Sequence, residues 1–307
     1  MAFGRGRLSF EGKLCRMSEA RAQVQHAGFM MGTARLSGAS RVHKQRWLEF
    51  KTPISRRATI ALGVAIWVLF FALWEIAVAL GWVNAIFTPP PHTVLAGLYE
   101  MFVEDAFVVD VGISIYRIAV SFAAACLVAV PLGILMGSFR RIEAFVNPLV
   151  SAWRYLPAPA FIPLLLMWFG TGDGQKMALL FIGVLWFLIT LIMDHVKAVR
   201  SELIETSMTL GGNRWQILRT VVIPASMPHI VVAMRQMLAV TWTYLVIAEI
   251  VAATTGIGAV MMRAKRFLHV DKIMASIIVI GFLGLLFDFL FRRAHRLLFP
   301  YLDDREH

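Results

Sequence analysis

The 307-residue sequence has few of the residue patterns from which catalytic and metal sites are built. Its two cysteines, Cys15 and Cys126, are far apart and form no CxxC pair, so a disulfide framework is not expected. Its eight histidines show no HExxH or other metal-ligand spacing. No Ser/His/Asp grouping or pair of catalytic carboxylates is recognisable. We therefore expect no catalytic residues and no metal site in this chain.

Motifs for nucleotide binding and secretion are also missing. No GxxxxGK[ST] motif is present, and the glycine-rich stretch 170–174 lacks its spacing, so the chain is not expected to cradle ATP phosphates itself. The N-terminal segment lacks the short apolar core and the cleavage site of a signal peptide. We expect no cofactor bound by this chain alone.

Charge is scarce, and apolar residues are abundant. Only 16% of the residues are charged, whereas soluble domains have about 25%. Hydrophobic residues make up 59% of the chain, and the mean hydropathy is +0.70. The apolar residues fall in runs of about 20, the length that crosses roughly 30 Å of hydrocarbon as a helix. The composition therefore predicts an all-α protein that crosses a lipid bilayer several times.

Six segments have the length and composition of membrane-spanning helices. They cover residues 59–80, 111–136, 144–169, 176–193, 228–252 and 273–291. Pro157, Pro159 and Pro163 interrupt the third segment, and a proline inside a helix removes a backbone hydrogen bond. Such a break is tolerated beside other helices or a cavity, so it points weakly to a transport pathway. We expect a transmembrane domain over residues 58–300 and a short tail over 301–307.

The distribution of basic residues predicts the orientation in the membrane. Twelve of the 30 Lys and Arg residues lie within residues 1–57, which predicts a basic, poorly ordered cytoplasmic segment rather than a nucleic-acid site. Residues 81–110 contain no Lys or Arg, whereas basic residues follow the second, fourth and sixth spans. This alternation predicts that both termini and the loop after the fourth span are cytoplasmic.

One loop opposes that orientation. Arg263, Lys265, Arg266 and Lys272 lie between the fifth and sixth spans, in a loop that should face outward. These cations would either attract an anionic substrate or the acidic surface of a binding protein, or form an ordinary solvated face.

The polar segment 201–224 has a distinctive spacing. An acidic residue is followed six positions later by a glycine, and an apolar-x-apolar-Pro sequence ends thirteen positions after that glycine. This pattern resembles the cytoplasmic EAA loop of ABC importer permeases, in which a short helix docks into a partner ATPase. The matching positions are Glu205, Thr206, Ser207, Gly211, Val221, Ile223 and Pro224, with Thr206 and Ser207 in place of the usual two alanines.

The segment has a mechanical interpretation beside the resemblance. Gly211 permits a sharp turn or a close approach, and Pro224 can end the preceding segment. Glu205 would lie near a helix start or pair with a cation such as Arg214. The alternative is an ordinary cytoplasmic loop with a Gly-Gly turn.

The resemblance extends over residues 60–300. Residues 89–95, 156–172 and 248–258 are similar to segments of the nitrate, sulfonate, taurine and bicarbonate branch of these permeases. The resemblance implies a type I ABC importer permease fold in the bacterial inner membrane. It also implies two ATPase subunits that bind ATP and Mg, a periplasmic or surface substrate-binding protein, and a second permease copy in a homodimer. The chain itself would not be an enzyme.

The substrate implied by the resemblance is a small anion. Residues 252–256 and 297–300 look more like taurine or alkanesulfonate permeases than nitrate ones, and nitrate and bicarbonate remain alternatives. A competing hypothesis from another class is an ion-driven secondary transporter that uses Glu75 and Glu249 as proton carriers.

Several residues within the spans are candidates for a pathway or gate. Arg154 precedes the broken third span and either helps to pass an anion or snorkels to the cytoplasmic surface. Glu249 is interpreted as a lock near the outer gate, held by an arginine or a backbone donor. The candidates are Arg154, Pro157, Pro163, Trp242, Glu249, Gly256 and Gly258, with packing as the alternative for Trp242 and a tight turn for the glycines.

Two ion pairs are expected within the spans. Glu75 and Arg117 are of opposite charge in the first and second spans, and we expect them to pair. Asp288 and Arg292 are four positions apart and are expected to pair along one helix face.

Overall fold

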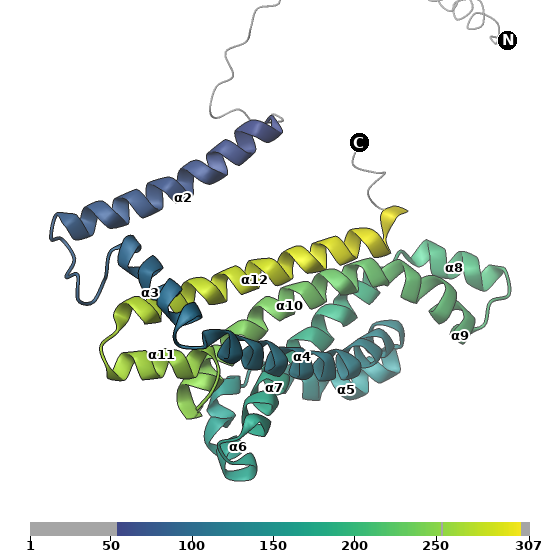
Figure 1. Cartoon of the computed structure of the whole chain (residues 1–307). Coiled ribbons are helices and arrows are strands. Elements are labelled where there is room, and N and C mark those ends of the chain that lie inside the picture. Colours follow the sequence, from purple (N-terminus) through teal and green to yellow (C-terminus); the bar gives the residue numbers. More distant parts are fainter. Residues whose placement is uncertain (1–53, 253, 302–307) are drawn as a thin grey trace, which may run out of the picture. The chain divides into compact units, whose positions relative to one another are not determined.

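Residues 54–252 and 254–301 are described by a computed structural model, and all regular structure in these ranges is helical (Figure 1). By their contacts, the residues from Gly63 onward form one unit, distinct from the residues up to Leu62. The expected basic segment 1–57 lies outside the described residues up to position 53, as do residues 302–307 of the tail. The helices are α2 (Arg56–Ala79), α3 (Pro91–Val103), α4 (Phe107–Ser138), α5 (Arg140–Arg154), η1 (Ala158–Phe161), α6 (Ile162–Phe169), α7 (Asp173–Lys197), α8 (Ser201–Thr209), α9 (Arg214–Ile217), η2 (Leu218–Val222), α10 (Ile223–Ala252), α11 (Ile257–Arg266) and α12 (Val270–Leu298).

The expected all-α membrane fold is confirmed. By length and composition, five helical segments of the described chain can cross a membrane, and a bent pair of helices brings the number to six. The longest is a continuous helical path from Arg214 to Val251, made of α9, η2 and α10. We call this path the α9–α10 rod. These segments correspond to the spans expected from hydropathy.

The core of the unit is formed by α4, α7 and α10. Gly133 and Gly137 let α4 approach α7 closely, because a Cβ at Gly137 would lie 2.6 Å from Cβ of Val196. Gly183 does the same between α7 and α10, where an added Cβ would lie 2.7 Å from the ring of Tyr244. Small residues at such contacts are typical of helix packing in membranes, where close van der Waals contact takes over from the hydrophobic effect.

The third span is not one helix. We expected a proline-interrupted span over residues 144–169, but the chain forms α5, the 3-10 turn η1 and α6, and its axis bends by 83° at the break. Pro157 precedes η1 and Pro163 lies in the first turn of α6. These positions tolerate proline because their N–H groups have no partner within a helix, so the prolines fix the bend between two short helices.

Two helices appear in segments that we expected to be loops. α3 and α11 occupy parts of residues 81–110 and 253–272. α3 packs closely on α12, since a Cβ at Gly97 would lie 2.8 Å from Oδ2 of Asp271. Lys272 donates from the first turn of α12 to Glu100 and Asp105, at 2.8 Å each.

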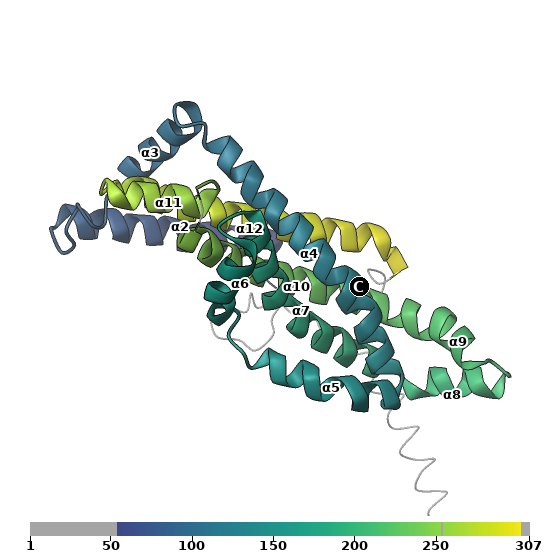
Figure 2. The same ribbon diagram turned by 90° about the horizontal axis from the view of Figure 1, so that it is seen from below.

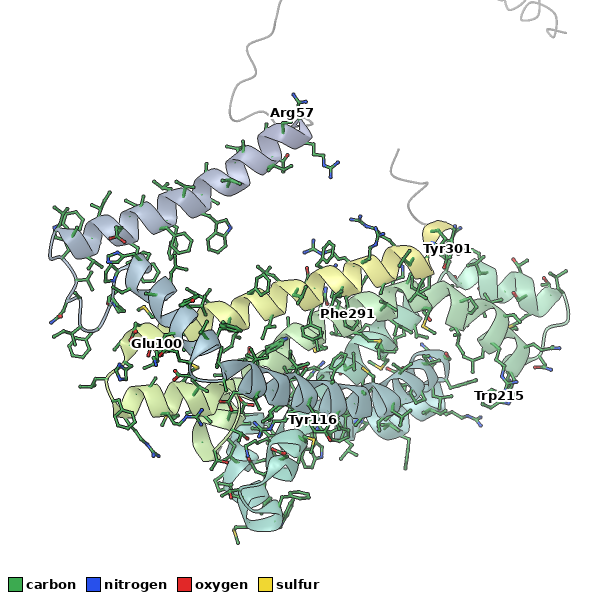
Figure 3. All side chains as sticks on the ribbon, viewed as in Figure 1. Arg57, Glu100, Tyr116, Trp215, Phe291 and Tyr301 are labelled. Carbon is green, nitrogen blue, oxygen red and sulfur yellow. The ribbon has the colours of Figure 1, made fainter. Side chains whose placement is uncertain are left out.

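The rod has two distinct ends. Figures 1 and 2 show α8 and α9 at one end and α11 at the other. Figure 3 labels Trp215 at the first end and Glu100 at the second. We refer to them below as the α8–α9 end and the α11 end.

Pro224 does not end a helix, contrary to expectation. The helix continues through it, because a π turn over Leu218–Val222 lies directly before it. In this turn the backbone N–H of Ile223 donates to the carbonyl of Leu218, five positions earlier. A π turn widens the helix locally, which makes room for a residue that lacks an N–H donor.

Candidate functional site

The segment between α8 and α9 is a tight turn built on a glycine. Gly211 has φ of +85° in the left-handed region, which confirms the sharp turn expected there. The N–H of Gly211 donates to Met208 O and that of Gly212 to Ser207 O, both at 3.0 Å. These bonds satisfy the last carbonyls of α8, as a glycine cap does at many helix ends. No atom outside its neighbours lies within 4 Å of a Cβ placed on Gly211, so backbone conformation alone selects the glycine.

The start of α9 is fixed by a reciprocal side-chain cap. Asn213 Oδ1 accepts from the backbone N–H of Gln216 at 2.9 Å, and Gln216 Oε1 accepts from the backbone N–H of Asn213 at 3.0 Å. This capping box satisfies two donors that have no partner inside the helix. Together with the glycine turn, it makes α8 and α9 a helical hairpin that is held by its own hydrogen bonds.

The two residues in place of the usual alanines are accommodated within α8. Thr206 Oγ1 donates to Glu202 O and Ser207 Oγ donates to Leu203 O, both at 2.7 Å. Each hydroxyl therefore bonds to the preceding turn of its own helix. The substitution therefore leaves neither hydroxyl without a hydrogen-bond partner.

Glu205 lies elsewhere than expected on this hairpin. It is exposed in the middle of α8 rather than near its start, and within the described chain it makes no ion pair with Arg214. Glu202 occupies the first turn instead, and Arg200 lies 3.4 Å from it. Hydrogen bonds from the Glu202 backbone and from Arg200 hold the pKa of the Glu202 carboxyl below its usual value. The sequence indicated the helix but not the register of its first turn.

The hairpin exposes several large apolar side chains at its tip and sides. Leu210, in the turn, is 83% exposed. Val221 and Ile223, the apolar motif positions, instead pack against the core, while Pro224 is exposed. The exposed apolar residues of the hairpin are Leu203, Met208, Leu210 and Trp215.

The α11 end contains a buried ionic network centred on Glu249. The Glu249 side chain is fully buried near the end of α10. Its Oε1 accepts from Arg117 Nη1 at 2.7 Å and from Ser114 Oγ at 2.8 Å, and its Oε2 accepts from the N–H of Gly258 at 2.8 Å. Glu249 thus has both kinds of partner that we expected, an arginine and a backbone donor.

Arg117 joins three elements through its guanidinium. Besides Glu249, it donates from Nε and Nη2 to Asp173 Oδ1 on α7, at 2.9 and 2.6 Å. Nη1 and Nη2 also donate to the carbonyl and hydroxyl oxygens of Thr255. The expected pair of Arg117 with Glu75 is wrong: Glu75 contacts His92 at 3.1 Å instead. Opposite charges on neighbouring spans do not determine which helix faces they occupy.

Backbone donors at the start of α11 complete the network. Gly256 N–H donates to Asp110 Oδ1 at 2.6 Å, and Ile257 N–H donates to Ser114 Oγ at 3.0 Å. Asp110 also pairs with Arg263 of α11 at 2.8 Å. Negative groups of α4 and α10 therefore hold the first turn of α11, where N–H groups lack partners within the helix.

The glycines of this turn are required by space as well as by conformation. Gly256 has φ of +103°, and a Cβ there would collide with the Glu249 carboxylate and lie 2.6 Å from Arg117 Nη1. A Cβ on Gly258 would lie 2.5 Å from that of Glu249. The tight turn expected at these glycines is present, and its tightness allows the Glu249 carboxylate to reach the backbone.

The other pathway candidates lie apart from this network. Arg154 ends α5, and its guanidinium lies over the ring of Tyr155, 5.5 Å from the centroid. Pro157 and Pro163 form the bend that follows. Trp242 is buried against Phe287 of α12, with ring centroids 5.9 Å apart, and its Nε1 has no partner in the described chain. The candidates thus divide between the α5–α6 bend, the core and the α11 end.

Sequence reasoning missed several members of the network. Asp110, Ser114 and Asp173 were not singled out, although Asp110, Ser114 and Arg117 repeat at helical spacing along one face of α4. That spacing of polar residues at the start of an apolar span was the available signal. The buried Lys176 was missed as well: its Nζ donates to the carbonyls of Thr171 and Gly172.

The chain is similar in sequence to transport permease proteins and in fold to a transporter of known structure. The taurine transport system permease protein TauC of Escherichia coli is 31% identical over 266 residues, covering 85% of this chain and 96% of TauC. The putative aliphatic sulfonates transport permease protein SsuC of Bacillus subtilis is 28% identical over 256 residues, covering 83% of this chain and 93% of SsuC. A chain of the MetNI methionine ABC transporter in an inward-facing conformation has a similar fold, with a TM-score of 0.54 and 20% identity over 68% of this chain and 97% of that one.

A family model covers more than half of the sequence. It matches residues 129–303, which include the broken third span, the helical hairpin and the α9–α10 rod with Glu249, but not the residues of α4 that bind Glu249. The chain therefore belongs to the family described as the binding-protein-dependent transport system inner membrane component.

Proposed function

We propose that this chain is the membrane-spanning permease subunit of an ATP-driven importer of a small anion, and that the partner ATPase acts on the α8–α9 hairpin. The observation that carries the proposal is the hairpin itself. It is held by its own caps and turn, and it presents Leu210 and Glu205 outward at one end of the rod. A protruding apolar tip with charges around it suits a groove on another protein.

The α9–α10 rod offers a mechanical link between the two ends. Its 38 residues from Arg214 to Val251 correspond to a helix about 57 Å long at about 1.5 Å per residue. A displacement of α9 by the ATPase would be carried along this helix to Glu249 and the first turn of α11. ATP and Mg would bind to the ATPase subunits, while this chain binds no cofactor and performs no chemistry.

For the substrate, we propose an organosulfonate such as taurine or an alkanesulfonate. The names of the two relatives support this class, as do residues 252–256 and 297–300. Nitrate and bicarbonate are the alternatives within the family. Vesicles containing the chain with its ATPase and binding protein should accumulate labelled taurine when ATP is enclosed. Competition by alkanesulfonates but not by nitrate or bicarbonate would support the sulfonate class, and the reverse order would reject it.

An ion-driven transporter is the competing class. It would need a carboxyl group free to exchange protons, but Glu249 accepts three hydrogen bonds and Glu75 contacts His92. Uptake in the absence of ATP, driven by a proton gradient alone, would favour this class and contradict the importer. Uptake that requires hydrolysable ATP would exclude it.

The proposed assembly has two copies of this chain, two ATPases and a periplasmic or surface binding protein in the bacterial inner membrane. Both termini and the hairpin would face the cytoplasm, in agreement with the basic residues near them. In intact cells, an impermeant thiol reagent should label a cysteine at Glu104 but not one at Asn213. Labelling of the second site would contradict both the orientation and the coupling role.

The coupling role is tested by two charge reversals on one helix. Glu205→Lys should reduce co-purification of the ATPase on the order of tenfold or more, because a misplaced charge in a protein interface costs several kcal/mol. Glu202→Lys is the matched control, since Glu202 contacts Arg200 within the chain. Equal retention of the ATPase by wild type and both variants would show that the hairpin does not contribute to the interface.

A further inference from the structure

A large cavity lies at the α8–α9 end, where six elements meet. Its volume is about 1000 Å³, it is open on one side, and it is lined by the end of α4, the start of α5, the end of α7, the α8–α9 hairpin and η2. One part of its wall is apolar and another is basic. The apolar lining includes Val196, Ile204, Met208, Ile217, Leu218 and Val222, and the basic lining consists of Arg140, Arg141, Lys197 and Arg214.

The positive charge of this cavity is not balanced by acidic residues in the part of the chain that the structure describes. Glu143 is the one acidic residue in its lining, and it already pairs with Lys197 at 2.5 Å. Within residues 54–252 and 254–301, the side chains of Arg140, Arg141 and Arg214 make no hydrogen bond or ion pair. Three exposed arginines of the cavity lining thus have no anionic partner within these residues.

The local backbone adds to this positive character. α5 starts at Arg140, and its N-cap residue, Phe139, makes no side-chain cap. The first N–H groups of a helix have no partner within it and carry partial positive charge. Both residues line the cavity, so the start of the helix adds to the charge of the arginines.

We propose that this cavity binds a phosphate group, supplied by an anionic phospholipid or by soluble phosphate. Guanidinium groups bind phosphate oxygens in a bidentate manner, and Arg140, Arg141 and Arg214 approach from two elements, α5 and α9. Basic pockets between membrane helices near the cytoplasmic surface are suited to anionic headgroups, and the apolar wall would accept the start of an acyl chain. The cavity lies apart from the pathway candidates, and Met208 and Arg214 of its lining belong to the hairpin proposed to contact the ATPase.

A phosphate bound here would connect the hairpin to the spans. Arg214 belongs to α9, whereas Arg140 and Arg141 belong to the start of α5. A shared anion would replace their mutual repulsion with attraction, and would hold the hairpin against the ends of α4 and α7. Bound ligand therefore stabilises the folded chain by mass action.

The first arm of the test uses the wild-type, full-length chain, purified in detergent and stripped of lipid. Native mass spectrometry should detect retained phosphatidylglycerol, but not diacylglycerol with the same acyl chains. Inorganic phosphate at millimolar concentration should displace the lipid if the headgroup occupies the cavity. Retention of inorganic phosphate without retention of lipid would support the site and assign the soluble source. Equal retention of both lipids with no effect of phosphate would overturn the proposal.

The second arm uses matched variants. The triple variant Arg140→Gln, Arg141→Gln, Arg214→Gln should lose phosphatidylglycerol or phosphate binding by about tenfold or more, because charge-assisted hydrogen bonds to the anion are lost. The corresponding lysine variant keeps the charge and should retain part of the binding. Arg293→Gln with Arg296→Gln is the control, since these exposed arginines of α12 lie outside the cavity lining. Equal losses in the glutamine triple and the control would indicate general surface adsorption and overturn the proposal.

Discussion

The two ends of the α9–α10 rod are held together in different ways. At the α11 end, the hydrogen bonds connect residues far apart in the sequence, such as Arg117 and Glu249, which are 132 positions apart. Within the α8–α9 hairpin, they connect residues three to five positions apart, such as Asn213 with Gln216 and Thr206 with Glu202. The α11 end is therefore a tertiary joint, whereas the hairpin is a local unit.

This difference determines what each end leaves for other molecules. Glu249 and Arg117 are buried and use their hydrogen-bonding groups within the chain. In the hairpin, the glycine turn and the capping box pair backbone groups at the helix ends, and the side chains of Glu205 and Leu210 stay exposed. The buried network joins α4, α7, α10 and the start of α11, whereas the proposed contact with an ATPase would use exposed side chains of the hairpin.

The largest expected effect comes from removing one charge of the buried pair. Arg117→Met should destabilise the chain by about 3–5 kcal/mol, because it leaves Glu249 buried without its cation. Thermal unfolding of the detergent-purified chain should show a large decrease in Tm. Adding Glu249→Gln should restore part of the loss, since the uncompensated charge is then gone.

The matched control for this variant is an exposed pair. Asp288 and Arg292 pair one helical turn apart, as expected from their spacing; both are partly exposed, and Asp288 also lies 3.4 Å from Arg235. Arg292→Met should therefore change stability by about 1 kcal/mol or less. Equal decreases in Tm for Arg117→Met and Arg292→Met would remove the distinction between joint and surface.

Two glycines provide a second comparison between the ends. Gly256 has a backbone conformation used almost only by glycine, and that strain alone would cost an alanine about 1–3 kcal/mol. Gly256→Ala should lower the free energy of unfolding by more than this, because the added Cβ also collides with Glu249. Gly211→Ala should cost about 1–2 kcal/mol, because it introduces left-handed strain into open space. The difference between the Tm decreases of the two variants measures what the collision with Glu249 adds to backbone strain. A larger Tm decrease for Gly211→Ala than for Gly256→Ala would contradict this interpretation.

Most of what could be predicted from the sequence depends on local spacing. The runs of apolar residues predicted the helical membrane fold, and the Glu205–Pro224 spacing predicted the hairpin region with its turn at Gly211. The pair Asp288–Arg292 was predicted because four positions along a helix bring side chains together. In each case the chain neighbours alone determine the geometry.

What could not be predicted depends on how helices are rotated against one another. Arg117 was expected to meet Glu75, but the orientation of α4 directs it towards Glu249 and Asp173. Helix packing also gives partners to the basic residues between the fifth and sixth expected spans, which oppose the predicted orientation. Arg263 pairs with Asp110, and Lys272 pairs with Glu100 and Asp105, so part of its charge is neutralised by α3 and α4.

A moderate effect is expected from removing the cap of α9. Asn213→Ala should destabilise the hairpin by about 1 kcal/mol, because it leaves the Gln216 N–H without its acceptor. The loss should be local, so amide exchange should accelerate in α9 while the amides of α4 and α7 stay protected. Faster exchange throughout the core would show that the hairpin is not an independent unit.

The smallest effect is expected where this chain departs from the EAA pattern. Thr206→Ala and Ser207→Ala restore the usual residues and remove hydroxyls that bond only to Glu202 O and Leu203 O within the described chain. Alanine has the higher helix propensity, so stability should rise by at most about 0.7 kcal/mol per substitution. Co-purification of the ATPase should equal that of wild type, in contrast to Glu205→Lys. A clear loss in either alanine variant would mean that the hydroxyls contact the partner directly, and α8 would then present two polar groups to the ATPase besides its carboxylate.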